Sequence, residues 1–494
     1  MGLRKMRTPR SVIHYLLPLL LFSCHLSAEE SEFAELKSQL HLQSKRIELL
    51  EAALLKLGVE VGTFGEDCGQ KDPAKPSEIS KDGRDARALQ TKKMQSVERE
   101  ESPAKVHHES GTVVVRQSED WPVSMKIGGR MQFRYTGFSR QSRTFRFDNG
   151  RTGEQADKNE FEIERGRLDF RGYIGRPEIQ YYLNLDFDTD DNHDVKAHDF
   201  WVNYLFDEAF DLYVGKAFVP GSREWLNGST TTHLVDRSLA TSFFRPDRSI
   251  GIWAIGEPLS GFHYRTMVSN GFITTDLESE DVDNQFTYST SFWGDIIGDY
   301  GKGAADLEWH NELAVQVGTS FTYSPIDGSS LGEPIGEADV VRTSDGVRIT
   351  NPDAVVLGST ISEYDIYLYA LDLALKYEGL GINSEFYIRE IREILDSHGA
   401  ELSSFQDSGL TVDAGYFVLP KLFEVVARYS YVDGEVSNAS EFAGGFNYYL
   451  NGTHQNKISF DVSRIDDSPI SSSGPNYLVG ETGTLYRLQW QIGF

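Results

Sequence analysis

Met125–Gly137 reads MKIGGRMQFRYTG, a stretch in which apolar or small side chains alternate with polar ones. In an extended chain successive side chains point to opposite faces. One face would then carry Met125, Ile127, Gly129, Met131, Phe133, Tyr135 and Gly137, and the other Lys126, Gly128, Arg130, Gln132, Arg134 and Thr136. A strand of this length with one uncharged face is longer than most strands of soluble proteins. It matches a tilted membrane-spanning strand with its apolar face outward and its polar face inward.

The same alternation recurs to the end of the chain, notably near 165–174, 181–187 and 442–450, and in the terminal YRLQWQIGF, which ends on the outward-facing Phe494. Strand centres are expected near residues 131, 169, 183, 201, 213, 252, 266, 290, 315, 370, 385, 411, 427, 446, 460 and 490. The sequence therefore predicts an all-β fold, a 16-stranded antiparallel transmembrane β-barrel (16–18 strands) over 122–494. The alternative is a large soluble β-sandwich, whose strands would be shorter.

The connections between these strands alternate in length. Long ones are expected near 139–160, 217–248, 271–285, 324–363 and 392–404, and short ones near 175–178, 206–209, 257–261, 378–379 and 451–453. Alternating long loops and short turns is typical of membrane barrels, whose two ends face different compartments. A barrel of 16 to 18 strands leaves an aqueous channel.

The residues before the barrel suggest export and self-association. Basic residues, a short apolar run and Leu26-Ser27-Ala28 give 1–28 the pattern of a signal peptide, and Cys24 offers a weaker lipoprotein alternative. Apolar residues at heptad spacing predict a short coiled coil over 29–58: Phe33, Leu36, Leu40, Ile47, Leu50, Leu54 and Leu57. The polar segment 59–121 is expected to be a flexible linker. After signal cleavage, Cys68 would be the one remaining cysteine.

Composition excludes several classes of protein. The chain has 494 residues and a formal net charge of −27, which argues against a nucleic-acid binder. It has no apolar run of 18 or more residues, which excludes a bundle of membrane helices.

Basic side chains gather on the inward face of the first two expected strands. They are Lys126, Arg130, Arg134, Arg165, Arg167 and Arg171, with weaker additions at Lys216, Arg389, Arg428 and Arg487. Cations in a pore raise the local concentration of anions, and arginine binds phosphate with two parallel hydrogen bonds. The alternative is that these cations pair with acids expected on the same face, namely Asp169, Asp186, Glu424 and Asp461.

Signals for catalysis and metal binding are weak. GSSLG at 328–332 fits the hydrolase string G-x-S-x-G, but it lies in a long loop without a strand before it and a helix after it. DFDTDDNHD at 186–194 lacks the central glycine and final glutamate of a calcium loop. No H-E-x-x-H zinc motif occurs. We expect neither an enzyme nor a cofactor, although Ser330→Ala would test an outer-membrane hydrolase.

Several segments resemble the phosphate-selective porin O and P family: FEIERGRLDFRGYIG, IQYYLNLDF, LYVGKAFVPGSREW, DRSLATSFFRPDRSIGIWAIGE, EVVARYSYVDG, FAGGFNYYLNG and LYRLQWQIGF. The resemblance covers about 122–494 and implies a 16-stranded, trimeric outer-membrane porin with a basic lumen that passes anions. It also implies that the third long loop, 217–248, folds inward and carries Arg223, Arg237, Arg245 and Arg248.

The expected function is therefore passive diffusion of small anions across the bacterial outer membrane, with phosphate-type solutes favoured. The expected partners are such anions, outer-membrane lipid and two further copies of the chain. The alternative is a non-selective diffusion porin whose coiled coil tethers the outer membrane to the cell wall. Deletion of 29–120 would separate the two, because a tether would detach the envelope without changing conductance.

Overall fold

The computed structural model describes residues 105–109, 112–116, 121–142, 144–147, 150–189, 195–275, 277, 281–328, 336–470 and 478–494. The predicted signal peptide, the predicted coiled coil, Cys68 and residues 329–332 of the GSSLG string lie outside the described residues. Among the residues described, no helix has the length and apolar character needed to cross a bilayer.

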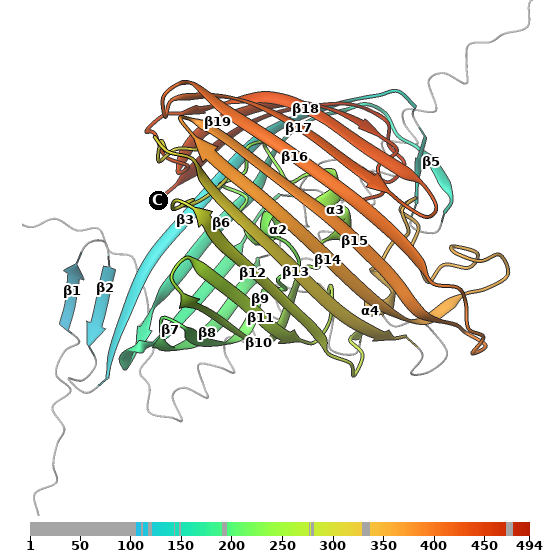
Figure 1. Ribbon diagram of the computed structural model, residues 1–494, viewed down its shortest axis with the longest axis horizontal. Coiled ribbons are helices and arrows are strands. Elements are labelled where there is room, and N and C mark those ends of the chain that lie inside the picture. The colour runs from blue at the N-terminus through green and yellow to red at the C-terminus, as the bar shows by residue number, and fades with distance from the viewer. Residues whose placement is uncertain are drawn as a thin grey trace, which may run out of the picture. The chain divides into compact units, whose positions relative to one another are not determined.

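Sixteen strands form the wall of a barrel (Figure 1). They are β3 (Pro122–Arg140), β6 (Lys158–Ile174), β7 (Arg176–Asp186), β8 (Lys196–Asp207), β9 (Phe210–Phe218), β10 (Arg248–Leu259), β11 (Phe262–Ser269), β12 (Thr287–Ile297), β13 (Ala314–Asp327), β14 (Ile361–Tyr377), β15 (Leu380–Asp396), β16 (Phe405–Leu419), β17 (Phe423–Asp433), β18 (Asn438–Tyr449), β19 (Asn456–Asp466) and β20 (Gly483–Gly493).

Each of these strands pairs antiparallel with the next, and the last pairs with the first. β20 runs beside β3 from Gly483↔Arg140 to Gly493↔Arg130, which closes the sheet. A closed sheet leaves no free edge along its length. The predicted 16-stranded antiparallel barrel is thereby confirmed, and every expected strand centre lies inside an observed strand.

A hairpin of β1 (Lys105–Glu109) and β2 (Thr112–Arg116) lies within the segment predicted as a linker. β2 pairs with the start of β3, from Thr112↔Lys126 to Arg116↔Pro122. This part of β3 extends beyond the last residue of β20, so without β2 one edge of it would lack backbone partners.

Side chains alternate between lipid and lumen as the sequence predicted. Phe133 on β3, Phe200 on β8 and Trp490 on β20 are among the large apolar residues exposed on the outer surface. On the inner face of β3, Gln132 and Arg134 are fully buried. A β-bulge at Gln132/Phe133 interrupts the register between β3 and β6.

The two ends of the barrel differ. At one end, which we call the short-turn end, the connections are brief except for 298–313 between β12 and β13. There Glu378 and Gly379 join β14 to β15. Both residues have positive φ (44° and 84°), as the two central residues of a type I′ hairpin turn require. The other end, the long-loop end, carries the connections 219–247, 270–286 and 328–360. An additional sheet of β4 (Thr144–Arg146) and β5 (Thr152–Glu154) lies in the loop between β3 and β6.

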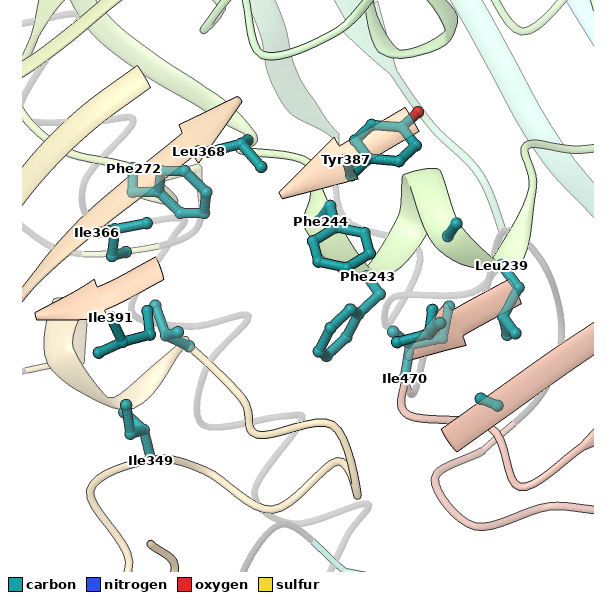
Figure 2. Close-up of a cluster of buried hydrophobic side chains, with 14 of the residues drawn as sticks. Leu239, Phe243, Phe244, Phe272, Ile349, Ile366, Leu368, Tyr387, Ile391 and Ile470 are labelled. Carbon is teal, nitrogen blue, oxygen red and sulfur yellow. The ribbon is translucent and has the colours of Figure 1, made fainter. Parts of the chain in front are cut away.

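An apolar core lies inside the barrel rather than outside it. Helix α3 (Leu239–Phe244), from the loop 219–247, contributes the buried side chains of Leu239, Phe243 and Phe244. Figure 2 shows them beside Tyr387 on β15 and Ile470. The ring of Phe244 stacks on that of Tyr387, with centroids 5.3 Å apart. This packing fixes the loop against the inner wall.

Candidate functional site

The loop 219–247 connects β9 to β10 and crosses the lumen (Figure 1). It contains α3 and a shorter helix, α2 (Arg223–Leu226), and each begins at a serine side chain that accepts a backbone hydrogen bond. On the far wall, α3 contacts β15, β16 and β17. Leu239 N donates to Glu441 on β18, and Ala240 N donates to Ser430 on β17. The expectation that this loop folds inward agrees with these contacts.

Buried ion pairs hold the loop to the strands near the barrel seam. Asp236 Oδ2 lies 3.0 Å from Arg134 Nη2 and 3.0 Å from Arg165 Nη2. Glu164 lies 3.1 Å from Arg134 Nη1. Burial alone would raise the pKa of Asp236, but Arg165 and Arg134 outweigh it and hold that pKa well below its usual range. Asp236 therefore stays ionised between its two partners.

Between this loop and the strands β3 and β6–β8 lies a cavity of about 440 Å³. Its basic lining residues are Arg130, Arg165, Arg167, Lys196, Arg237, Arg245 and Arg248. Its acidic lining residues are Glu164, Asp169, Asp186, Asp188, Asp199 and Asp247. The aromatic rings of Tyr182, Phe218 and Trp225 complete it. Seven basic side chains thus face six acidic ones, and because six of the seven are arginines we call this space the arginine cavity.

Several of these arginines are paired with a carboxylate. Arg167 Nη2 lies 2.6 Å from Asp186 and Arg248 Nε lies 2.9 Å from Asp199. Arg245 Nη1 lies 2.7 Å from Asp247, two residues further along the same loop. The alternative stated above, that the lumenal cations pair with acids on the same face, therefore holds for many of them. Paired charges are partly neutralised and contribute less to the field of the pore.

Arg130 and Arg237 differ from the other arginines of the cavity. Neither has a carboxylate within ion-pair distance among the described residues, and the Nε atom of Arg130 is buried without a hydrogen-bond partner. Arg237 donates to the carbonyl oxygens of Glu224, Trp225 and Asn227. Burial, together with Arg165 and Arg245, outweighs the attraction of Asp236 and lowers the pKa of Arg237 to about 9. Both groups are thus cationic and lack a direct ion pair, although carboxylates lie nearby.

The ring of Trp225, in the loop 219–247, makes cation–π contacts with two arginines of the cavity. The guanidinium carbon of Arg245 lies 4.0 Å from its centroid, and that of Arg237 lies 4.7 Å from it. Cation–π contacts of this kind orient a guanidinium group without neutralising its charge. The indole nitrogen of Trp225 is buried and has no hydrogen-bond partner in the described structure.

The structure separates the predicted pore residues into three groups. Arg130, Arg165, Arg167, Arg237 and Arg245 line the arginine cavity. The guanidinium of Arg134 is fully buried in ion pairs beside it. The remaining predictions, Lys126, Arg171 and Arg223, lie elsewhere: Lys126 faces Arg171 across β3 and β6 toward the short-turn end, where both are exposed, and Arg223 pairs with Asp372 at 2.7 Å.

The weaker basic candidates also have partners. Arg389 lies 2.6 Å from Asp407, Arg428 lies 3.3 Å from Glu224 and Arg487 lies 2.8 Å from Asp461. Lys216 Nζ donates to the carbonyl oxygens of Ala197 and Thr275. These cations stabilise contacts within the barrel wall, and Arg428 also binds the loop 219–247.

Sequence reasoning missed Asp236 and the aromatic residues of the cavity. Asp236 immediately precedes Arg237 in a loop that was expected to fold inward, and an acid at that place could have been considered as a partner for the basic strands. Trp225 lies two residues after Arg223 in the same loop. Nothing in the strand periodicity indicates which inward residue such a loop will meet.

One group of three side chains among the described residues could offer ligand atoms to a metal ion: Asp306, Glu308 and His310. The carboxylate of Asp306 already accepts hydrogen bonds from His310 Nδ1 and from the backbone of Gly379. Glu308 lies 3.2 Å from Lys376 Nζ. The three side chains thus serve to fix the turn 298–313. Most of the acidic run 186–194 lies outside the described residues.

The family described as phosphate-selective porin O and P matches residues 126–473 of this sequence. The chain belongs to that family. It is an outer-membrane porin, and its barrel is a channel wall. The expected family membership is confirmed.

Several solved porins and channels match this chain at low sequence identity. An anion-selective porin from Comamonas acidovorans is 10% identical, with a TM-score of 0.49, and the match covers 75% of this chain and 100% of that one. OmpT of Vibrio cholerae, folded in vitro, is 10% identical, with a TM-score of 0.48 and coverage of 76% and 98%. The outer-membrane channel DcaP of Acinetobacter baumannii is 10% identical, with a TM-score of 0.47 and coverage of 75% and 97%. No curated protein matches the sequence.

Proposed function

We propose that this porin passes small anions through the arginine cavity and that it favours phosphate-type solutes. The observation that carries the proposal is the pair of cations without a carboxylate partner, Arg130 and Arg237, in a space that the loop 219–247 narrows. Charge near a low-dielectric wall is weakly screened, so two guanidinium groups without an ion-pair partner contribute strongly to the local field. Arginine also offers the planar, bidentate geometry that suits phosphate oxygens.

The selectivity should be moderate rather than absolute. Carboxylates lie among the arginines of the cavity, and they lower the local potential that an entering anion meets. The acidity of the whole chain does not decide the question, because permeation depends on the field at the narrow part of the pore. We further propose that the porin is a trimer, exported by the predicted signal peptide, with the predicted coiled coil assisting assembly.

The test is the reversal potential of full-length protein in a planar bilayer with a potassium chloride gradient. Wild-type channels should be anion-selective. Because each substitution removes one positive charge without an ion-pair partner, Arg130→Gln and Arg237→Gln should each shift the reversal potential toward cation selectivity and lower phosphate conductance.

Arg176→Gln is the matched control, because it removes the same charge from an exposed position outside the cavity. It should shift the reversal potential much less. Cation selectivity of the wild type, or equal shifts for Arg130→Gln and Arg176→Gln, would contradict the proposal.

A further inference from the structure

Four aromatic side chains form a continuous row on the inner wall, on four adjacent strands. They are Tyr182 on β7, Trp201 on β8, Tyr213 on β9 and Trp253 on β10, and we call them the lumenal aromatic row. The ring centroids of Tyr182 and Trp201 are 5.3 Å apart, those of Trp201 and Tyr213 are 5.1 Å apart, and those of Tyr213 and Trp253 are 5.3 Å apart.

These residues face the lumen and not the lipid. Their strand neighbours Phe200, Val202, Val214 and Ile252 are exposed on the outer surface, and side chains alternate along a strand. The lumen of a diffusion porin is ordinarily polar. Four adjacent aromatic rings on that wall are therefore unusual for a polar lumen.

Packing accounts for part of the row, because Trp201 and Tyr213 also contact the apolar cluster around Trp253. Trp253 is buried with Met267 and with Ala217 and Val219, which lead into the loop 219–247. Tyr182, Trp201 and Tyr213 remain only half-buried. Part of the surface of these three residues therefore stays accessible from the pore.

Both ends of the row meet a cation that lacks a carboxylate partner. Tyr182 lines the arginine cavity together with Arg130. At the other end, the guanidinium carbon of Arg265 lies 5.7 Å from the ring of Trp253. Arg265 donates to the carbonyl oxygen of Phe218, and its Nε atom is buried without a hydrogen-bond partner among the described residues.

We propose that the lumenal aromatic row binds the ring of aromatic carboxylates during passage, while the arginines at its ends hold the carboxylate. A ring stacks on an exposed aromatic side chain with little demand on its substituents, and the adjacent guanidinium supplies the charge. The substrate class is thus an organic anion with one aromatic ring. This inference rests on the proposed anion pathway and adds a site that an inorganic anion would not use.

The experiment measures how benzoate and acetate reduce the chloride current of single full-length channels in a planar bilayer. The two probes carry the same charge and differ in the ring. Benzoate should reduce the current at a lower concentration than acetate does. Trp201→Ala should weaken the apparent benzoate affinity about fivefold, the loss expected for one aromatic contact, and leave acetate unaffected. Trp201→Phe should retain most of the affinity.

Tyr204→Ala is the matched control, because Tyr204 lies on the same strand and its ring is exposed on the outer surface. It should bind benzoate as the wild type does. Tyr213→Leu provides a second lumenal variant if Trp201→Ala does not fold, as judged by heat-modifiable electrophoretic migration. Equal action of benzoate and acetate on the wild type would overturn the inference, as would equal benzoate affinity in the folded lumenal variants and Tyr204→Ala. The reversal potential of the same wild-type channels in potassium chloride tests the anion pathway separately.

Discussion

At the scale of single residues, Asp236 joins the loop 219–247 to two strands of the wall. One carboxylate oxygen lies 3.0 Å from both Arg134 and Arg165. Asp236→Asn would leave two buried cations with less compensation, and breaking a buried pair in this way costs about 3–5 kcal/mol. We expect a clear fall in the temperature at which the barrel unfolds, measured by heat-modifiable migration. Asp345→Asn, which removes the partner of the half-exposed Arg146, should cost less than about 1 kcal/mol.

The same carboxylate gives a pH dependence with a definite sign. The pKa of Asp236 is lower in the folded protein than in an unfolded chain, because Arg165 and Arg134 outweigh the effect of burial. Its contribution to stability is therefore complete above the ordinary pKa of aspartate, about 3.9, and is lost as the pH falls through the folded-state pKa. A wild-type unfolding temperature that did not fall more steeply in acid than that of Asp236→Asn would contradict this assignment.

At the scale of elements, the loop 328–360 carries a buried acid at helix α4 (Gly336–Asp339). Glu337 is 1% exposed, and burial, together with Asp283, raises its pKa to about 8. Because its ordinary pKa is 4.5, the folded protein binds a proton between about pH 4.5 and 8 that the unfolded chain releases. The stability that the loop gains from this proton is thus present at the acid end of that window and is lost as the pH rises.

Hydrogen exchange of residues 336–350 should show this loss directly. After correction for intrinsic rates, these amides should exchange faster at pH 8.5 than at pH 6 in the wild type. Glu337→Gln should remove most of that difference, because the amide does not ionise. Glu401→Gln, at an exposed position of another loop, should leave it unchanged. An unchanged pH response in Glu337→Gln would show that another group controls the loop.

At the scale of the whole molecule, we expect the predicted coiled coil to strengthen a trimer. Leu50→Asp with Leu54→Asp places charges at seam positions of the heptad pattern, where they oppose knobs-into-holes packing. Cross-linking in mild detergent should then yield fewer trimers than the wild type. Lys45→Asp, off the seam, should leave the yield unchanged. Monomers alone in the wild type would contradict the trimer.

The barrel was predictable from sequence because each strand faces lipid on one side and water on the other. Apolar and polar residues therefore alternate along the strand with a period of two. The ion pairs were not predictable in this way. Asp236 is 102 residues from Arg134, and their contact depends on where the loop 219–247 meets the wall. The β-bulge at Gln132/Phe133 was not predictable either, because one extra residue on β6 leaves no mark in the amino-acid composition of the strand. Alternation predicted which side chains face inward but not which of them are paired.

The pairing of β3 with β20 has a consequence for how the chain reaches its native state. Most strand contacts join neighbours in sequence, whereas this seam joins the first and last strands of the barrel, for example Arg130 to Gly493. Closing a loop of roughly 360 residues costs about 3 kcal/mol more entropy than closing a hairpin of about ten. Contacts of such high sequence separation slow folding. We therefore expect closure of the seam to be the slow kinetic step, with an open sheet accumulating before it.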